Sequence, residues 1–152
     1  MNKSITTIIV DDQASCIEIL SKDLARYPEI QIIETTTSSE KAKKIIIKQQ
    51  PDLLFLDVEM PYGNAFDVLE GCKDLYFETI FVTAFSEYSL RALNQSAAYY
   101  LLKPVSIEEL ILAVNKVQQH IINREIFNRN KILVENLREP KPEKRQVILP
   151  TL

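Results

Sequence analysis

The chain has 152 residues, of which 46% are hydrophobic and 26% charged, and its net charge is −3. This length and composition indicate one globular domain with a modest appendage, and the negative balance argues against direct nucleic-acid binding by its body. Two glycines exclude a glycine-rich phosphate loop, and two cysteines are too few for a disulfide framework. Because no apolar run is long enough to span a membrane, we expect a cytoplasmic protein.

The first strand and helix are marked by a change in periodicity. Residues 5–10 are all β-branched, which is typical of a strand, and Asp11 and Asp12 follow them directly. Apolar residues then recur at helical spacing as far as Pro28, so we expect an amphipathic helix. The predicted apolar face of this helix consists of Ala14, Ile17, Leu20, Leu24 and Tyr27.

A second strand and helix follow in the same order. Residues 30–34 predict the strand and residues 40–50 the helix, with N-cap candidates at 37–39 and Pro51 as its stop.

The run Leu53–Leu56 is the stretch around which the chain is organised. Apolar residues bounded by turn signals indicate a strand buried on both faces. It ends on Asp57, and Pro61 follows soon after. Open α/β sheets bind ligands at the carboxyl ends of their strands, and carboxylates are known nucleophiles toward phosphorus. We therefore expect Asp57 to accept a phosphoryl group.

The second half of the chain continues the alternation. The pattern predicts helices at 65–73 and 87–95 and strands at 79–83 and 99–102. Ser106 and Glu109 form a capping-box sequence that opens a long helix, expected to reach about residue 123 and to continue toward 136. Strands and helices thus alternate five times, which predicts a parallel sheet with helices on both faces.

Polar side chains follow four of the five predicted strands: Asp11 and Asp12, Asp57, Thr83, and Lys103. The carboxyl ends of parallel strands meet at one edge of a sheet. Three carboxylates close together call for a cation, and Mg²⁺ suits such hard oxygen ligands. Thr83 would offer a hydroxyl and Lys103 an ammonium to a phosphoryl group.

Blander interpretations exist for each residue taken singly. Asp11 and Asp12 fit helix caps, Lys103 a solvated strand end, and Tyr100 ordinary packing. The occurrence of all these residues at strand ends favours the interpretation as a phosphoryl-accepting site. Cys16 and Cys72 are expected to be packing residues.

Taken together, four segments resemble the receiver domain of two-component response regulators: Asp11-Asp12, the run from Leu56 to Pro61, Val82-Thr83-Ala84, and the run from Tyr100 to Pro104. The resemblance covers roughly residues 4–122. It implies a flavodoxin-like (βα)5 three-layer α/β sandwich with a parallel sheet in the order 2-1-3-4-5.

The resemblance also assigns roles. Asp57 would be phosphorylated by a sensor histidine kinase. Asp12, Asp57 and the backbone carbonyl of Glu59 would bind Mg²⁺, with Asp11 acting mostly through water. Thr83 and Lys103 would contact the phosphoryl oxygens, and Thr83 with Tyr100 would form a switch pair. The chain departs from the common pattern at Ala65, where many members have Gly, and Phe85 occupies a position that tunes dephosphorylation.

The tail suggests a particular subfamily. Residues 138–145 resemble a charged linker, and residues 147–149 resemble the start of a further strand. Together with the motif from Tyr88 to Leu93 and the run from Tyr99 to Pro104, the tail from Val147 to Thr151 is most similar to regulators with a LytTR-type (LytR/AlgR family) DNA-binding domain. We therefore expect a receiver domain at 1–122, a helical extension at 123–137, and at 138–152 a linker entering a missing output domain.

The expected function is a switch in transcription regulation, without turnover of a substrate. Phosphorylation would alter the face made by the predicted helix 87–95, the strand 99–102 and the last helix. Dimerisation would use that face or the C-terminal helix, and DNA would be bound only by the missing domain. The alternatives are a stand-alone receiver or phosphorelay protein and a phosphohydrolase of the haloacid dehalogenase type.

Overall fold

The computed structural model describes residues 4–58, 60, 65–84 and 99–138. The strands are β1 (Ile5–Val10), β2 (Ile30–Thr36), β3 (Leu53–Leu56), β4 (Glu78–Thr83) and β5 (Tyr99–Leu102). The helices are α1 (Ala14–Leu24), α2 (Ser39–Gln49), α3 (Ala65–Gly71) and α5 (Ile107–Arg138). The predicted helix at 87–95 and the predicted strand start at 147–149 lie outside the described residues.

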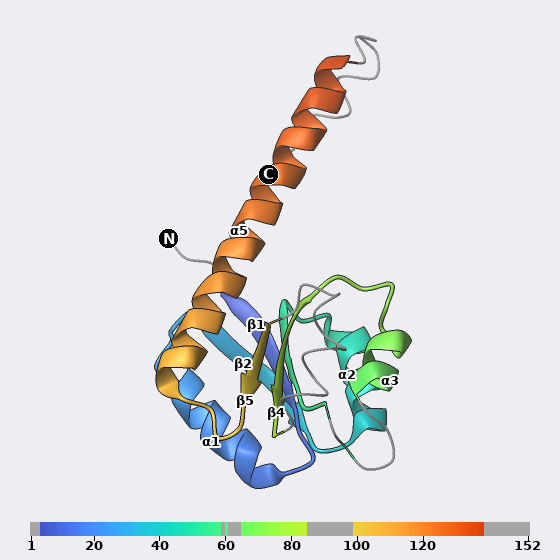
Figure 1. The fold of residues 1–152 in the computed structure, drawn as a ribbon. Coiled ribbons are helices and arrows are strands. Elements are labelled where there is room, and N and C mark those ends of the chain that lie inside the picture. Colours follow the sequence, from blue (N-terminus) through green and yellow to red (C-terminus); the bar gives the residue numbers. More distant parts are fainter. Residues whose placement is uncertain (1–3, 59, 61–64, 85–98, 139–152) are drawn as a thin grey trace. The chain divides into compact units, whose positions relative to one another are not determined.

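The strands form one parallel sheet in the order β2-β1-β3-β4-β5, which confirms the expected topology. Helix α1 lies on one face of this sheet, and α2 and α3 lie on the other (Figure 1). This three-layer arrangement is the predicted flavodoxin-like fold, and it brings the carboxyl ends of all five strands to one edge.

The core on the α2 and α3 face explains why the layers form. Alternate side chains of a strand point to the same face of a sheet. Accordingly, Ile8, Val10, Leu54, Leu56 and Phe81 pack with Ala42 and Ile46 of α2 and with Ala65 and Val68 of α3. All four residues of β3 are buried, as expected for the central strand of such a sheet.

Local signals set the ends of several helices. Ser38 is the N-cap of α2, where its Oγ accepts a hydrogen bond from Lys41 N at 3.2 Å. Gln50 ends that helix in the left-handed region, with φ 47°, just before Pro51. Ser106 Oγ accepts from Glu109 N at 3.1 Å, as the capping-box pattern predicts.

Helix α1 departs from its predicted pattern. It ends at Leu24 rather than at Tyr27, and Tyr27 N instead donates to Leu24 O at 3.0 Å in a closing turn. Leu20 and Leu24 are buried as predicted. Ala14, however, is exposed, because it is the first residue of the helix, directly after the N-cap at Gln13.

The chain divides into two compact units, Met1–Asn115 and Lys116–Leu152, and each is described by itself. Helix α5 runs without a break to Arg138, so the predicted extension of the last helix is confirmed. The boundary expected at residue 122 stays a prediction. Among the described residues, no helix is long and apolar enough to cross a membrane.

Candidate functional site

The central strands place two carboxylates side by side. Val10 pairs with Leu56 across β1 and β3, so Asp11 and Asp57 leave adjacent strands at the same level. Asp57 N donates to Val10 O at 3.0 Å, which extends the strand pairing by one residue. Both acids are almost fully buried, at 4% and 5% exposure. Burying two like charges so close together is unfavourable unless a cation joins them.

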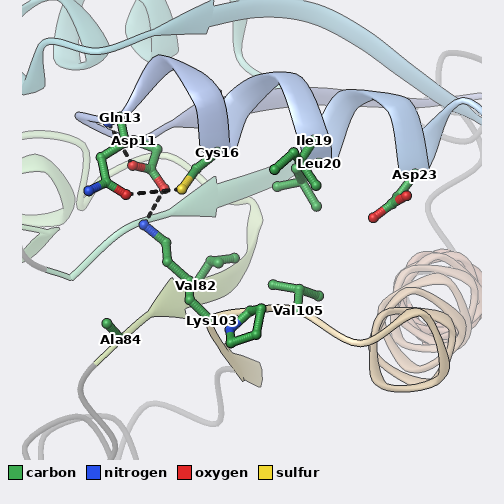
Figure 2. Close-up of a pocket in the computed structure, with 11 residues that line it drawn as sticks. Asp11, Gln13, Cys16, Ile19, Leu20, Asp23, Val82, Ala84, Lys103 and Val105 are labelled. Atoms are coloured by element: carbon green, nitrogen blue, oxygen red, sulfur yellow. Dashed lines mark hydrogen bonds and ion pairs between the residues drawn. The ribbon is translucent and has the colours of Figure 1, made fainter.

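Lys103 provides that positive charge. Its backbone N donates to Thr83 O at 2.8 Å, which holds the residue at the end of β5 beside β4. Its Nζ lies 2.8 Å from Asp11 Oδ2 and 3.3 Å from Asp57 Oδ2. Figure 2 shows the Lys103 side chain reaching up to Asp11 beside the start of α1. The ammonium therefore bridges the two buried carboxylates.

The pKa of Lys103 reflects this environment. Burial on its own would lower the pKa of this amine, because it disfavours the charged form. The hydrogen bond with Asp11 and the charges of Asp57 and Asp11 outweigh burial and raise the pKa above its ordinary value. Lys103 is thus a permanent cation at the site.

Asp12 completes an acidic cluster with Asp11 and Asp57. Each of the three offers one carboxylate oxygen, and these oxygens lie within 4.8 Å of one another. Asp12 is the most exposed of the three, so it lies on the side open to solvent. Carboxylate oxygens are the hard ligands that Mg²⁺ prefers, so the chemistry of this cluster fits that ion. Among the described residues of the site, three carboxylates and one ammonium leave negative charge that a divalent cation could neutralise.

The N-cap interpretation of the two leading acids is wrong. The N-cap of α1 is Gln13, and its side chain makes no capping hydrogen bond. Asp11 instead accepts a hydrogen bond from Gln13 N through Oδ1, at 2.9 Å. With Oδ2 on Lys103, both of its oxygens are engaged, and the carboxylate is fixed in orientation.

Thr83 and Tyr100 occupy neighbouring strands. Thr83 is fully buried at the end of β4. Tyr100 of β5 pairs with Phe81, two residues before Thr83, so both side chains belong to the same face of the sheet. The Tyr100 ring is partly buried and packs against the core cluster of the α2 and α3 face. Glu59, the loop at 61–64 and Phe85 lie outside the described residues.

A cleft of about 410 Å³ adjoins the site on the α1 face, and the sequence interpretation missed it. Figure 2 shows Cys16, Ile19 and Leu20 of α1 on one side and Lys103 and Val105 on the other. Ile19 is 61% exposed although it is large and apolar. Cys16 lines the cleft, where its Sγ donates to Gln13 Oε1 at 3.0 Å. Ile19 could have indicated this cleft in the sequence, because it is a large apolar residue outside the predicted apolar face of the first helix.

Comparison with known proteins agrees with this geometry. Residues 7–115 match the family of response regulator receiver domains. An uncharacterized response regulatory protein of Shewanella oneidensis is 32% identical over 118 residues, covering 77% of this chain and 50% of that protein. The sensory transduction protein LytT of Enterococcus faecalis is 30% identical over 116 residues, covering 75% of this chain and 48% of that protein. The chain thus spans about half the length of these relatives.

Solved structures support the same fold. A DNA-binding response regulator of the LuxR family from Staphylococcus aureus superimposes with a TM-score of 0.67 at 29% identity, over 75% of this chain and 98% of that one. The REC domain of AraT, a response regulator from Geobacillus stearothermophilus, gives a TM-score of 0.72 at 21% identity, over 80% of this chain and 98% of that one. The sheet order, the strand-end acids and these matches agree: the chain belongs to the receiver domain family of two-component response regulators.

Proposed function

We propose that this chain is a phosphorylation-driven switch in which Asp57 accepts a phosphoryl group from a sensor histidine kinase. The observation that carries the proposal is the position of Asp57, buried beside Asp11 and within 3.3 Å of the Lys103 ammonium. A carboxylate oxygen of Asp57 attacks phosphorus, a P–O bond forms, and the P–N bond to the donor histidine breaks. The imidazole leaves and takes up a proton from solvent.

Magnesium fits the acidic cluster on chemical grounds. Asp11, Asp12 and Asp57 would hold it, together with the backbone carbonyl of Glu59 that the family resemblance implies. When bound, the ion supplies charge neutralisation for the carboxylate and the phosphoryl oxygens. Because the cluster carries more negative than positive charge, its own repulsion favours binding of a divalent cation.

Lys103 and Thr83 would contact the phosphoryl group. In the unphosphorylated chain, Lys103 is held by Asp57 and Asp11, so its ammonium already lies beside the carboxylate that would be phosphorylated. The phosphoryl group competes with Asp11 for that ammonium. Thr83 and Tyr100 share one face of the sheet, which supports their role as the switch pair. A change at the site would thus reach β5 through Thr83, whose carbonyl binds the Lys103 N–H.

The output is proposed to be DNA binding by a further domain. The chain covers about half of LytT, and the Staphylococcus aureus neighbour is named a DNA-binding response regulator. We infer that the whole protein carries a LytTR-type domain after the linker predicted at 138–152. Sequencing the gene beyond the codon for Leu152 tests this inference, and a stop codon directly after it would favour a stand-alone receiver or phosphorelay protein.

Phosphoryl labelling tests the central proposal. With Mg²⁺ and acetyl phosphate, the chain should gain one acid-stable, base-labile phosphoryl group, and Asp57→Asn should lose that label completely. The matched control is Asp52→Asn, which changes the carboxylate just before the same strand and should be labelled as the wild type is. Labelling of Asp57→Asn at the wild-type rate would contradict the assignment. Sustained turnover of small phosphate esters by the wild type would instead indicate a phosphohydrolase.

A further inference from the structure

The cleft beside α1 extends away from the acidic cluster along that helix (Figure 2). Its volume of about 410 Å³ is in the range of small-molecule sites. All of its lining residues belong to the unit Met1–Asn115. An apolar surface that is open to water is stabilised by an occupant that covers it. Most of the lining is of this kind: Cys16, Ile19, Leu20, Val82, Ala84, Pro104 and Val105.

One wall of the cleft is a single face of α1. The wall consists of residues at positions i, i+3, i+4 and i+7, which lie on the same side of a helix: Cys16, Ile19, Leu20 and Asp23. The first three give the wall an apolar surface. The fourth places a carboxylate about 10 Å from Cys16 along the helix axis. Figure 2 shows Asp23 at the opposite end of the cleft from Asp11, so the apolar wall ends on an acid.

The carboxylate of Asp23 is not neutralised by the protein. It is half-buried, and it forms no hydrogen bond or ion pair with the part of the chain that the structure describes. Lys22 of the same turn is exposed and does not pair with it. Asp23 also lies in the last turn of α1, where the helix dipole already presents negative charge. An acid is unfavourable at this position, so this end of the cleft attracts a cation.

The other end of the cleft does not reverse this preference. Lys103 lines it, but its ammonium is engaged by Asp11 and Asp57 at 2.8 and 3.3 Å. Two carboxylates and one ammonium thus leave the described lining with net negative charge. The lining is also much smaller than the roughly 20–30 residues that each partner contributes to a stable protein interface. The cleft therefore suits a small organic cation with an apolar body.

We propose that this cleft binds a small amphipathic amine, whose ammonium pairs with Asp23 and whose apolar chain lies against Ile19 and Cys16. The binding needs no phosphoryl group at Asp57, so it does not rest on the proposed function. Because Cys16 lines the cleft, an occupant shields its thiol from solvent.

Alkylation of Cys16 measures whether the cleft is occupied. Cys72 is buried, so iodoacetamide should modify Cys16 first in the full chain. Octylammonium is the probe, and at saturation it should slow this reaction at least about fivefold because the thiol loses access to solvent. Octanoate has an apolar chain of similar length and the opposite charge, and it should change the rate by less than about twofold. Mass spectrometry of the digested protein gives the rate at each cysteine.

Two substitutions on α1 locate the ammonium and the chain of the probe. Asp23→Asn should weaken octylammonium binding about fivefold, because it removes a partly exposed ion pair. Ile19→Gln should weaken it about tenfold through lost apolar contact, and it spares the core because Ile19 is 61% exposed. The matched control is Glu18→Gln, since Glu18 is an exposed acid of the same helix that does not line the cleft. Its affinity, measured by titration calorimetry, should stay within about 1.5-fold of the wild type.

Four results would overturn the proposal. One is a lack of octylammonium binding up to millimolar concentration, which would leave the cleft to a protein partner. Another is equal protection of Cys16 by octanoate, because the cleft would then not recognise charge. A third is equal loss of affinity in Asp23→Asn and Glu18→Gln. The last is release of octylammonium by Mg²⁺, because the amine would then occupy the acidic cluster rather than pair with Asp23.

Discussion

The two ends of the parallel sheet each hold an aspartate next to β3, and the protein treats the two differently. At the amino end, Asp52 Oδ2 accepts hydrogen bonds from Thr6 N and Thr6 Oγ1 at 3.0 and 3.1 Å. At the carboxyl end, Asp57 shares one ammonium with Asp11, and Asp12 lies beside them. Neutral donors from a neighbouring strand satisfy Asp52, whereas the carboxyl end retains an excess of negative charge.

This difference distinguishes Asp52, which supports the sheet, from Asp57, to which the proposed function assigns the chemistry. Asp52 also uses its backbone, since its N donates to Thr6 O and its carbonyl accepts from Glu78 N, both at 2.9 Å. It therefore ties β1, β3 and β4 together. A charged residue at a strand end is a candidate binding site when the neighbouring protein groups do not fully neutralise its charge.

The largest effect is expected from Lys103→Met. Removal of this ammonium leaves Asp11 and Asp57 buried without their cation, so the free energy of unfolding should fall by about 2–4 kcal/mol. Mg²⁺ should restore part of that loss, because it supplies positive charge to the same carboxylates. Urea denaturation with and without Mg²⁺ measures both quantities.

A surface lysine provides the control for Lys103. Lys73 pairs with Glu70 at 3.0 Å, but the side chains of both are well exposed. Lys73→Met should therefore cost at most about 0.5 kcal/mol and should leave the Mg²⁺ response unchanged. An equal gain from Mg²⁺ in wild type and Lys103→Met would mean that Lys103 and the ion do not share the carboxylates.

A smaller effect is expected at the other end of the sheet. Thr6 Oγ1 donates to Asp52 Oδ2 at 3.1 Å and accepts from Asp52 N at 3.0 Å, and Thr6→Val removes both contacts. The free energy of unfolding should fall by about 1–2 kcal/mol, with phosphoryl labelling of the folded protein unchanged. Thermal unfolding with and without Mg²⁺ checks this variant. If Mg²⁺ restored the stability of Thr6→Val, the amino and carboxyl ends of the sheet would not differ in their response to the ion.

The smallest effect concerns alkaline pH. The folded-state pKa of Lys103 is raised, so its contribution to stability is complete below the unfolded-state pKa of about 10.4 and is lost as the pH rises through the folded-state value. The stability difference between wild type and Lys103→Met should therefore be constant from about pH 7 to pH 10 and should shrink only above that range. Urea midpoints across this series provide the measurement, and a difference that already shrinks near neutral pH would contradict the assignment.

Much of the fold was predictable because its signals are local. Strand composition, Pro51 and the Ser38 cap fixed the strands and helices to within a few residues. The order of the strands came only through the family resemblance, since periodicity says nothing about which strands are neighbours. The inner face of α1 was partly wrong at Ala14, because a repeat at helical spacing does not show where a helix meets the edge of the sheet.

The site was predictable as a set of residues but not as a set of contacts. Asp11, Asp12, Asp57 and Lys103 gather at one edge because parallel strands share it. From the sequence, we expected Lys103 to contact the phosphoryl group, whereas in this structure its ammonium bridges two carboxylates. Ion-pair geometry depends on side chains far apart in sequence, so no local pattern contains it. The hydrogen bonds between Asp52 and Thr6 were missed for the same reason.

The hydrogen bond from Asp57 N to Val10 O forms only when β1 and β3 are paired, so the site is assembled late in folding. Asp57 and Lys103 are 46 residues apart in sequence, and Asp11 comes from a third distant segment. Closing such long loops costs chain entropy, and that cost is recovered only when β1, β3, β4 and β5 pair in register. A partly folded chain in which any of these strands is unpaired would not bring Asp11, Asp57 and Lys103 together. Under the proposed function, a nascent or damaged molecule would therefore not accept a phosphoryl group, and only a completely folded molecule would signal.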